Sequence, residues 1–154
     1  MFKNKGSTGF TLIELLVVLA IVGILVSVVL TQLSRAKNRS NDTAAKSGLN
    51  QARIQADIYY VSNGNYTNVC NSSTDSSNPK GINKMVYNSG AANNIAGTVK
   101  VNGVGASTVR CNDATNGWAA EVPLTNETGY YCVDYTRKGI VTSTSIGDTN
   151  GFCQ

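Results

Sequence analysis

The residue whose chemistry fits its surroundings least in this 154-residue chain is Glu14. It lies inside an apolar run at residues 10–30, FTLIELLVVLAIVGILVSVVL, which is made almost entirely of Leu, Ile and Val. A helix of that length spans about 30 Å, the thickness of the hydrocarbon core of a bilayer. Because a carboxylate near the bilayer centre costs about 2.5 to 3.5 kcal/mol, Glu14 is expected to need a partner.

Catalytic chemistry has little support elsewhere in the sequence. The chain contains no His, which excludes the usual general base at neutral pH and the Ser-His-Asp and Cys-His nucleophile arrangements. The remaining carboxylates of interest show no spacing that pairs two of them, and they are expected to be solvated: Asp113, Glu121, Glu127, Asp134 and Asp148. We therefore expect neither enzyme activity nor a cofactor.

All four cysteines lie beyond the apolar run: Cys70, Cys111, Cys132 and Cys153. An even number of cysteines in a small domain outside the cytoplasm indicates two disulfides, and three pairings are open. Zinc binding is not favoured, because the chain has neither a C-x-x-C pair nor a His.

One long helix, free of Pro, is predicted from about residue 10 to about residue 61. Beyond the apolar run, one apolar stripe recurs at spacings of four, three, four and three: Ala45, Leu49, Ala52, Ala56 and Tyr59. The helix therefore has an apolar first half at residues 10–33 and an amphipathic second half at 34–61, which must pack on a folded domain. The turn signal SNGN ends the helix, with Gly64 suited to a left-handed cap.

The motif G-F-T-L-I-E at residues 9–14 resembles the class III signal of type IV pilins and type II secretion pseudopilins, since a short basic leader precedes it and an apolar helix follows it. The resemblance implies a leader at residues 1–9, which a prepilin peptidase removes by cleavage between Gly9 and Phe10. It also implies N-methylation of the new Phe10 amine. Glu14 would then pair with the Phe10 amine of a neighbouring subunit during assembly.

A chain with this signal is expected to be a structural subunit that polymerises through its N-terminal helix into a type IV pilus or a related filament. Its expected partners are other copies of itself, the prepilin peptidase, and an inner-membrane assembly platform with a cytoplasmic ATPase. It would be a single-pass inner-membrane protein before assembly, and part of a cell-surface pilus or a periplasmic pseudopilus afterwards. The alternatives are a type II secretion pseudopilin, a minor pilin for DNA uptake, and a membrane-anchored binding module that never polymerises.

The resemblance also favours one disulfide pairing, Cys70 with Cys111 and Cys132 with Cys153, in which the second bond fixes the C-terminal tail to the strand region, as in many pilins.

Some pseudopilins bind calcium in this part of the fold, where Asp134 and Asp148 could supply oxygen ligands. No D-x-[DN]-x-[DN]-G pattern supports that alternative, so no metal site is expected.

The basic residues give two expectations. Removing Lys3 and Lys5 with the leader lowers the net charge from +4 to +2, which predicts no specific nucleic-acid partner. Four scattered basic residues are expected to be solvated rather than to form a DNA-binding patch: Lys80, Lys84, Lys100 and Arg110.

The basic residues on the C-terminal side of the apolar run conflict with the expected orientation: Arg35, Lys37, Arg39 and Lys46. By the positive-inside rule they would place the C-terminal domain in the cytoplasm. The cysteines and the leader favour the opposite orientation, with the domain outside the cytoplasm.

Residues 62–154 are expected to form an extracytoplasmic, loop-rich β domain with disulfides. Strands are predicted in five segments: 84–87, 98–101, 117–124, 130–135 and 139–142. Connections of hairpin length predict an antiparallel meander of three or four strands whose apolar face covers the helix stripe. Trp118 is expected to be a core or sheet-face aromatic. The fold class is α+β, a long N-terminal helix packed on a small antiparallel sheet, as in pilins.

Overall fold

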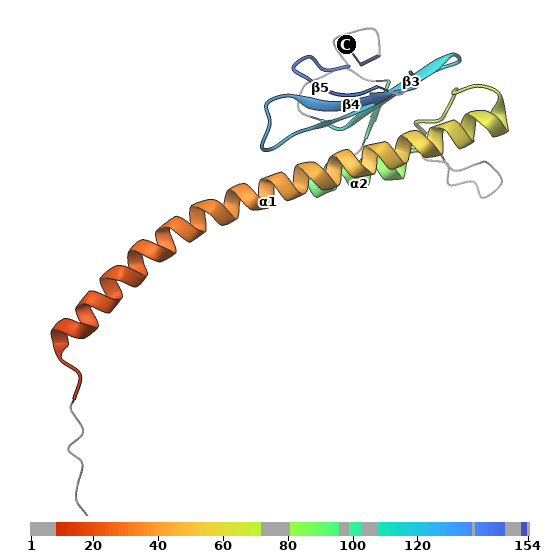
Figure 1. Cartoon of the computed structure of the whole chain (residues 1–154). Coiled ribbons are helices and arrows are strands. Elements are labelled where there is room, and N and C mark those ends of the chain that lie inside the picture. The colour runs from red at the N-terminus through yellow and green to blue at the C-terminus, as the bar shows by residue number, and fades with distance from the viewer. Residues whose placement is uncertain are drawn as a thin grey trace, which may run out of the picture. The chain divides into compact units, whose positions relative to one another are not determined.

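A computed structural model describes residues 9–71, 81–95, 99–102, 108–136, 138–146 and 152–153. The chain divides into two units, Met1–Ala36 and Lys37–Gln154. Helix α1 (Leu12–Asn63) contributes residues to both (Figure 1). The expected helix at residues 10–61 is confirmed to within two residues at each end.

In the first unit, every residue from 9 to 36 is exposed, and the exposed side chains are mostly apolar. Leu12 is 80% exposed and Val29 is 61% exposed. Helix α1 is long and apolar enough to cross a membrane, by length and composition. Its first half is therefore a candidate membrane span with apolar side chains all around it.

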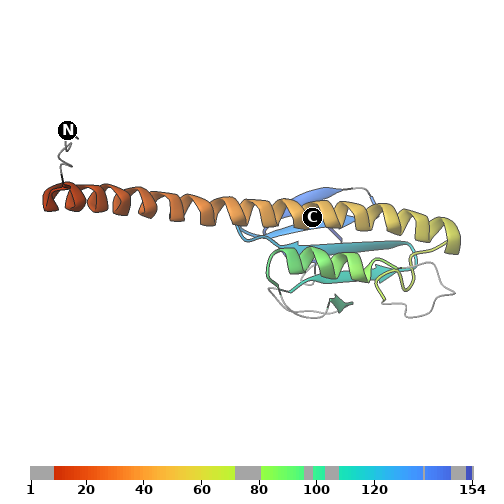
Figure 2. The same cartoon turned by 90° about the horizontal axis from the view of Figure 1, so that it is seen from below.

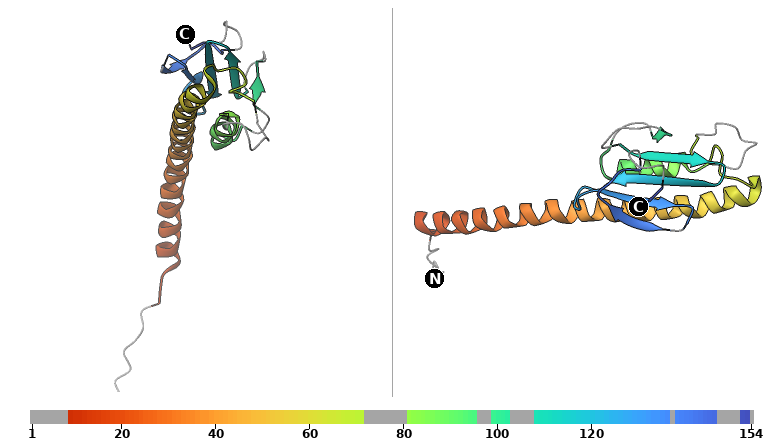
Figure 3. Two further views of the ribbon diagram at one scale, coloured as in Figure 1. Left: turned by 90° about the vertical axis from the view of Figure 1, so that its right-hand side faces the viewer. Right: turned by 90° about the horizontal axis from the view of Figure 1, so that it is seen from above.

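The second unit has two layers. Helix α2 (Asn83–Ala92) and the second half of α1 lie on the same side of one sheet, as Figures 2 and 3 show. The sheet has five strands in the order in which they occur along the chain: β1 (Lys100–Val101), β2 (Arg110–Ala114), β3 (Gly117–Pro123), β4 (Tyr130–Asp134) and β5 (Gly139–Thr142). Strand β1 runs parallel to β2, and the other neighbours are antiparallel.

The helix stripe predicted from the spacing is confirmed, because all five of its residues are buried in one core cluster with Trp118. Alternate residues of β3, such as Trp118 and Val122, point into that core. At Gly48, helix α1 packs tightly against α2, since a Cβ there would overlap the side chain of Ser89. Gly64 follows the helix with a φ of +72°, as its predicted role as a left-handed cap requires.

Three predicted strands are confirmed as β3, β4 and β5, but two other expectations were wrong and one strand was missed. Residues 84–87 belong to helix α2, where the burial of Val86, Ser89 and Gly90 follows the helical period. Strand β2 was not predicted, because its sequence RCNDA lacks the β-branched and aromatic residues typical of strands. The sheet is mixed rather than purely antiparallel, since the short β1 adds a parallel pair; Thr98, the start of the strand predicted there, lies outside the described residues.

Candidate functional site

Glu14 finds a partner within its own chain at the start of α1. Because the helix begins at Leu12, Thr11 is its N-cap residue and Glu14 is its third residue. The backbone N–H and the hydroxyl of Thr11 both donate to Oε2 of Glu14, each over 2.9 Å, and the backbone N–H of Glu14 donates to Oγ1 of Thr11 over 3.3 Å. This reciprocal arrangement is a capping box.

The capping box leaves part of the carboxylate available. Both donors from Thr11 use Oε2, and no residue that the structure describes bonds to Oε1 of Glu14. The carboxylate borders an open apolar groove of about 320 Å³ that is otherwise lined by Phe10, Ile13, Val17 and Val18. The site can therefore accept a second donor from outside this chain, next to a surface that other apolar side chains can cover.

Gly9 and Phe10 precede the helix and belong to no helix or strand. Phe10 is 84% exposed, and a Cβ added at Gly9 would meet nothing within 4 Å. The peptide bond between them is therefore sterically open to an enzyme. Lys3 and Lys5 of the expected leader lie outside the described residues.

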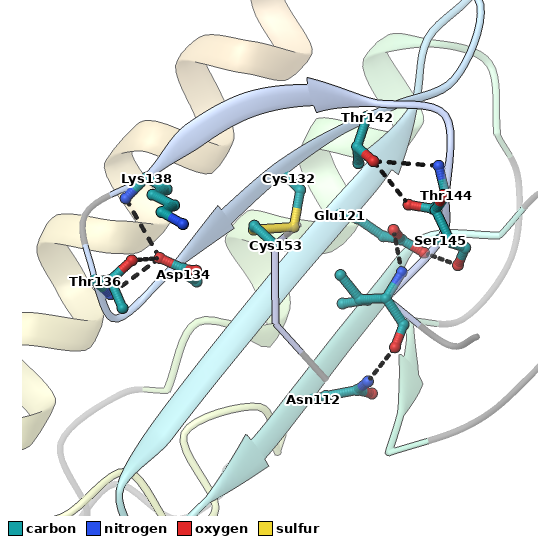
Figure 4. The surroundings of a disulfide bond; sticks show 11 residues. Asn112, Glu121, Cys132, Asp134, Thr136, Lys138, Thr142, Thr144, Ser145 and Cys153 are labelled. Carbon is teal, nitrogen blue, oxygen red and sulfur yellow. Dashed lines mark hydrogen bonds between the residues drawn. A yellow bond between two sulfur atoms is a disulfide. The ribbon is translucent and has the colours of Figure 1, made fainter. Parts of the chain in front are cut away.

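Two carboxylates of the sheet are buried, and the expectation that they are solvated was wrong. Glu121 is fully buried on the face of β3 that points away from α1. It accepts hydrogen bonds from the Ser145 hydroxyl and, over 2.9 Å, from the Ile146 N–H (Figure 4). Arg110, also expected to be solvated, is fully buried, with its Nε 3.6 Å from Oε1 of Glu121.

Asp134 is the second buried carboxylate, with an exposure of 1%. Its Oδ1 accepts hydrogen bonds from the N–H and hydroxyl of Thr136 and from the N–H of Lys138, so it orders the turn between β4 and β5 (Figure 4). Asp148, its suggested partner for calcium, lies outside the described residues. Within the described part of the chain, no three His, Cys, Asp or Glu side chains come together as metal ligands would.

The structure joins Cys70 to Cys111 and Cys132 to Cys153, with Cα atoms 5.5 Å and 5.7 Å apart. The second bond ties the tail to β4 on the same face as Glu121 (Figure 4). A second, smaller core cluster forms there, from Ala119, Cys132, Ile146 and Cys153.

The loop between β3 and β4 is fixed to α1 through Asp42, which the sequence did not single out. Oδ1 of Asp42 accepts from the N–H and hydroxyl of Thr125, and Oδ2 accepts from the N–H of Asn126, all over 2.8 to 2.9 Å. Burial acts to raise the pKa of Asp42, but these hydrogen bonds outweigh it and hold the pKa below its ordinary value. Beside it, Lys46 forms an ion pair with Glu127 over 2.7 Å.

An open polar hollow of about 250 Å³ lies at the same place, lined by four residues of α1 and two of the loop: Arg39, Asp42, Thr43, Lys46, Asn126 and Glu127. No local sequence signal could have revealed it, because Asp42 and Thr125 are 83 residues apart. The capping box is different, since the T-x-x-E spacing of Thr11 and Glu14 is a recognised signature that is visible in the sequence alone.

Comparison with known proteins agrees with the resemblance carried by the N-terminal residues. A family model described as "Prokaryotic N-terminal methylation motif" matches residues 4–30. The type IV wide pilus major component PilA4 of Thermus thermophilus is 43% identical over 63 residues, which are 41% of this chain and 48% of that protein. The toxin coregulated pilin of Vibrio cholerae is 38% identical over 69 residues, which are 45% of this chain and 31% of that protein.

These matches support a pilin-like structural subunit rather than an enzyme. The chain spans less than half the length of either relative, so the similarity concerns only part of each molecule. No solved structure matched the chain significantly.

Proposed function

We propose that this chain is the precursor of a type IV pilin-like subunit, cleaved between Gly9 and Phe10, N-methylated on Phe10, and polymerised through the first half of α1. The observation that carries the proposal is the carboxylate of Glu14, held in a capping box on an otherwise apolar, exposed helix with Oε1 left over. The match to the N-terminal methylation motif and the two pilus relatives support the same conclusion.

Assembly would bring two costly groups together. In apolar surroundings, a carboxylate and an ammonium each carry a large desolvation cost when alone. The Phe10 amine freed by cleavage would approach Oε1 of Glu14 on the next copy, which offsets both costs and fixes the axial register of the two helices. Because a different surface is used on each copy, the contact repeats along an open filament rather than closing into a dimer.

The same proposal includes partners and location. A prepilin peptidase would remove residues 1–9, and an inner-membrane platform driven by a cytoplasmic ATPase would extract the helix from the bilayer into the filament. The disulfide-bonded domain would lie outside the cytoplasm and form the filament surface. Because both named relatives are components of pili, a surface pilus is proposed ahead of a periplasmic pseudopilus.

Substitution of Glu14 by Gln tests the proposal, because Gln preserves the capping box but removes the charge. We expect Glu14→Gln to insert, to lose residues 1–9 and to gain a methyl group on Phe10 by mass spectrometry, yet to give no filaments by electron microscopy. The matched variant Thr11→Ala keeps the charge and weakens the helix start by about 0.5 to 2 kcal/mol. It should still form filaments. Normal filaments from Glu14→Gln would refute the charge pairing.

A further inference from the structure

Three basic residues follow the apolar run on α1 without any acid to balance them: Arg35, Lys37 and Arg39, here called the basic collar. All three are exposed, and among the described residues no acidic side chain forms an ion pair with them. Lys46 and Arg110 differ, since Lys46 pairs with Glu127 and Arg110 lies beside Glu121. The collar differs from the other exposed basic residues in its position, because its three charges follow directly after the apolar run within five residues of one helix.

The position of the collar is unfavourable for membrane insertion. It lies on the folded-domain side of the apolar run, where the positive-inside rule disfavours cations if that domain is exported. The next acid along the chain is Asp42, and its carboxylate is occupied by the N–H groups of Thr125 and Asn126. A ligand from outside the chain would account for three such charges.

We propose that the basic collar binds the phosphate groups of anionic phospholipids in the bilayer leaflet that faces the folded domain. Long side chains on a helix point back toward its N-terminus, so those of the collar extend toward the apolar run and can place their charged ends among the headgroups. Residues two apart are about 200° apart around a helix, so Lys37 faces away from Arg35 and Arg39, and the collar meets lipids on both sides. Guanidinium groups bind phosphate oxygens in a bidentate manner.

The experiment uses the full chain reconstituted in vesicles of phosphatidylcholine with a minority of phosphatidylglycerol. A spin-labelled phosphatidylglycerol reports its enrichment at the protein surface relative to a spin-labelled phosphatidylcholine. The triple variant R35Q/K37Q/R39Q is compared with K84Q/K100Q/K138Q, which loses the same charge at exposed positions of the folded domain. Each Lys or Arg near an anionic membrane surface raises the binding constant for that surface about fivefold. We therefore expect the enrichment of phosphatidylglycerol to fall by on the order of tenfold or more in the collar variant. The matched variant should retain it, and added salt should weaken it in the wild type.

Equal enrichment in the two triple variants would overturn the proposal, because it would show a general charge effect. Loss of enrichment in inorganic phosphate, but not in chloride of the same ionic strength, would also overturn it, because the site would then take a free anion. The inference rests on the proposed membrane insertion of α1, which alkaline extraction of the vesicles tests separately. Release of the wild-type chain by alkali would refute insertion itself, whereas a retained chain without enrichment refutes only the lipid site.

Discussion

Two carboxylates of this protein lie in apolar regions and are stabilised in opposite ways. Glu14, at the exposed start of α1, receives its hydrogen bonds from Thr11, three residues away. Glu121, fully buried in β3, receives its hydrogen bonds from Ser145 and Ile146, which are 24 and 25 residues further along the chain, and lies beside Arg110 on β2. One carboxylate depends on a single helical turn, and the other depends on the assembled sheet and tail.

The difference indicates how the two units can behave. A capping box forms wherever the helix forms, so Glu14 keeps its local partner whether α1 lies in a bilayer or against other helices. Glu121 is satisfied only while the segment that carries Ser145 and Ile146 covers the sheet. The hydrogen bonds of Glu14 therefore do not depend on the folded domain, which the extraction from a membrane proposed above would require.

The largest expected effect follows substitution of Glu121. Glu121→Ala leaves the Arg110 guanidinium buried without its carboxylate, and breaking a buried pair in this way costs about 3 to 5 kcal/mol of unfolding free energy. Thermal unfolding of the detergent-solubilised chain measures it, followed by the fluorescence of Trp118, which is the single Trp of the sequence and is buried in β3.

Two variants serve as controls for Glu121→Ala. Glu127→Ala removes the partner of Lys46 in a partly exposed ion pair, which is worth about 1 kcal/mol or less. The double variant R110M/E121M removes the unpaired guanidinium and should recover the part of the loss that Arg110 causes, although Met cannot accept from Ser145 and Ile146. If Glu121→Ala proves no worse than Glu127→Ala, Glu121 is as replaceable as a surface carboxylate and the contrast with Glu14 disappears.

The next effect concerns the bond between Cys132 and Cys153, which holds the tail over Glu121. Replacing both cysteines with Ala should lower the unfolding free energy by about 2 to 4 kcal/mol. A tail that opens more often also admits water to Arg110, so Glu121→Ala should cost less in this background than in the wild type. Strictly additive losses of unfolding free energy would show that the tail does not shield the pair of Arg110 and Glu121.

Peptide mapping under non-reducing conditions tests the pairing of all four cysteines.

Features that depend on neighbouring residues in the sequence could be predicted. The apolar period gave the long helix and its buried stripe, and the Gly64 turn signal gave its end, because a helix organises residues three and four apart. The three strands with aromatic and β-branched residues were also predicted. Strand β2 was not, since it is a strand only through its pairing with β1 and β3.

The buried polar groups could not be predicted either, because they too depend on pairing between residues that are distant in the sequence. Nothing near Arg110 or Glu121 in the sequence shows that the strand register places them side by side on the face that the tail covers. The sequence alone therefore predicts that both are solvated, and it predicts the same for Asp134, which is buried at its own turn. A charged residue is usually exposed, and only the tertiary structure identifies the exceptions.

Asp42 lies between the two extremes and gives the smallest expected effect. It is a helix residue like Glu14, but its donors, the N–H groups of Thr125 and Asn126, belong to a distant loop. Because its pKa is lowered in the folded state, its contribution is fully present above the unfolded pKa and is lost as the pH falls through the folded pKa. Asp42→Asn should cost about 1.5 to 3 kcal/mol near neutral pH, since hydrogen bonds to a charged group are replaced.

The difference in stability between the wild type and Asp42→Asn should therefore begin to shrink as the pH falls below about 4, the ordinary pKa of Asp in the unfolded chain. It should disappear only below the folded-state pKa, where the wild-type carboxyl is protonated and resembles the amide. Arg39, Lys46 and Glu127 also line the hollow and are the same residues in both proteins, so the two proteins differ only in the side chain at position 42. Asp57→Asn is the matched control, because Asp57 lies on the same helix and has no hydrogen bond to the loop among the described residues. A difference that stays constant from neutral to acid pH would mean that shape rather than charge fixes the loop. Asp42 would then resemble neither Glu14 nor Glu121.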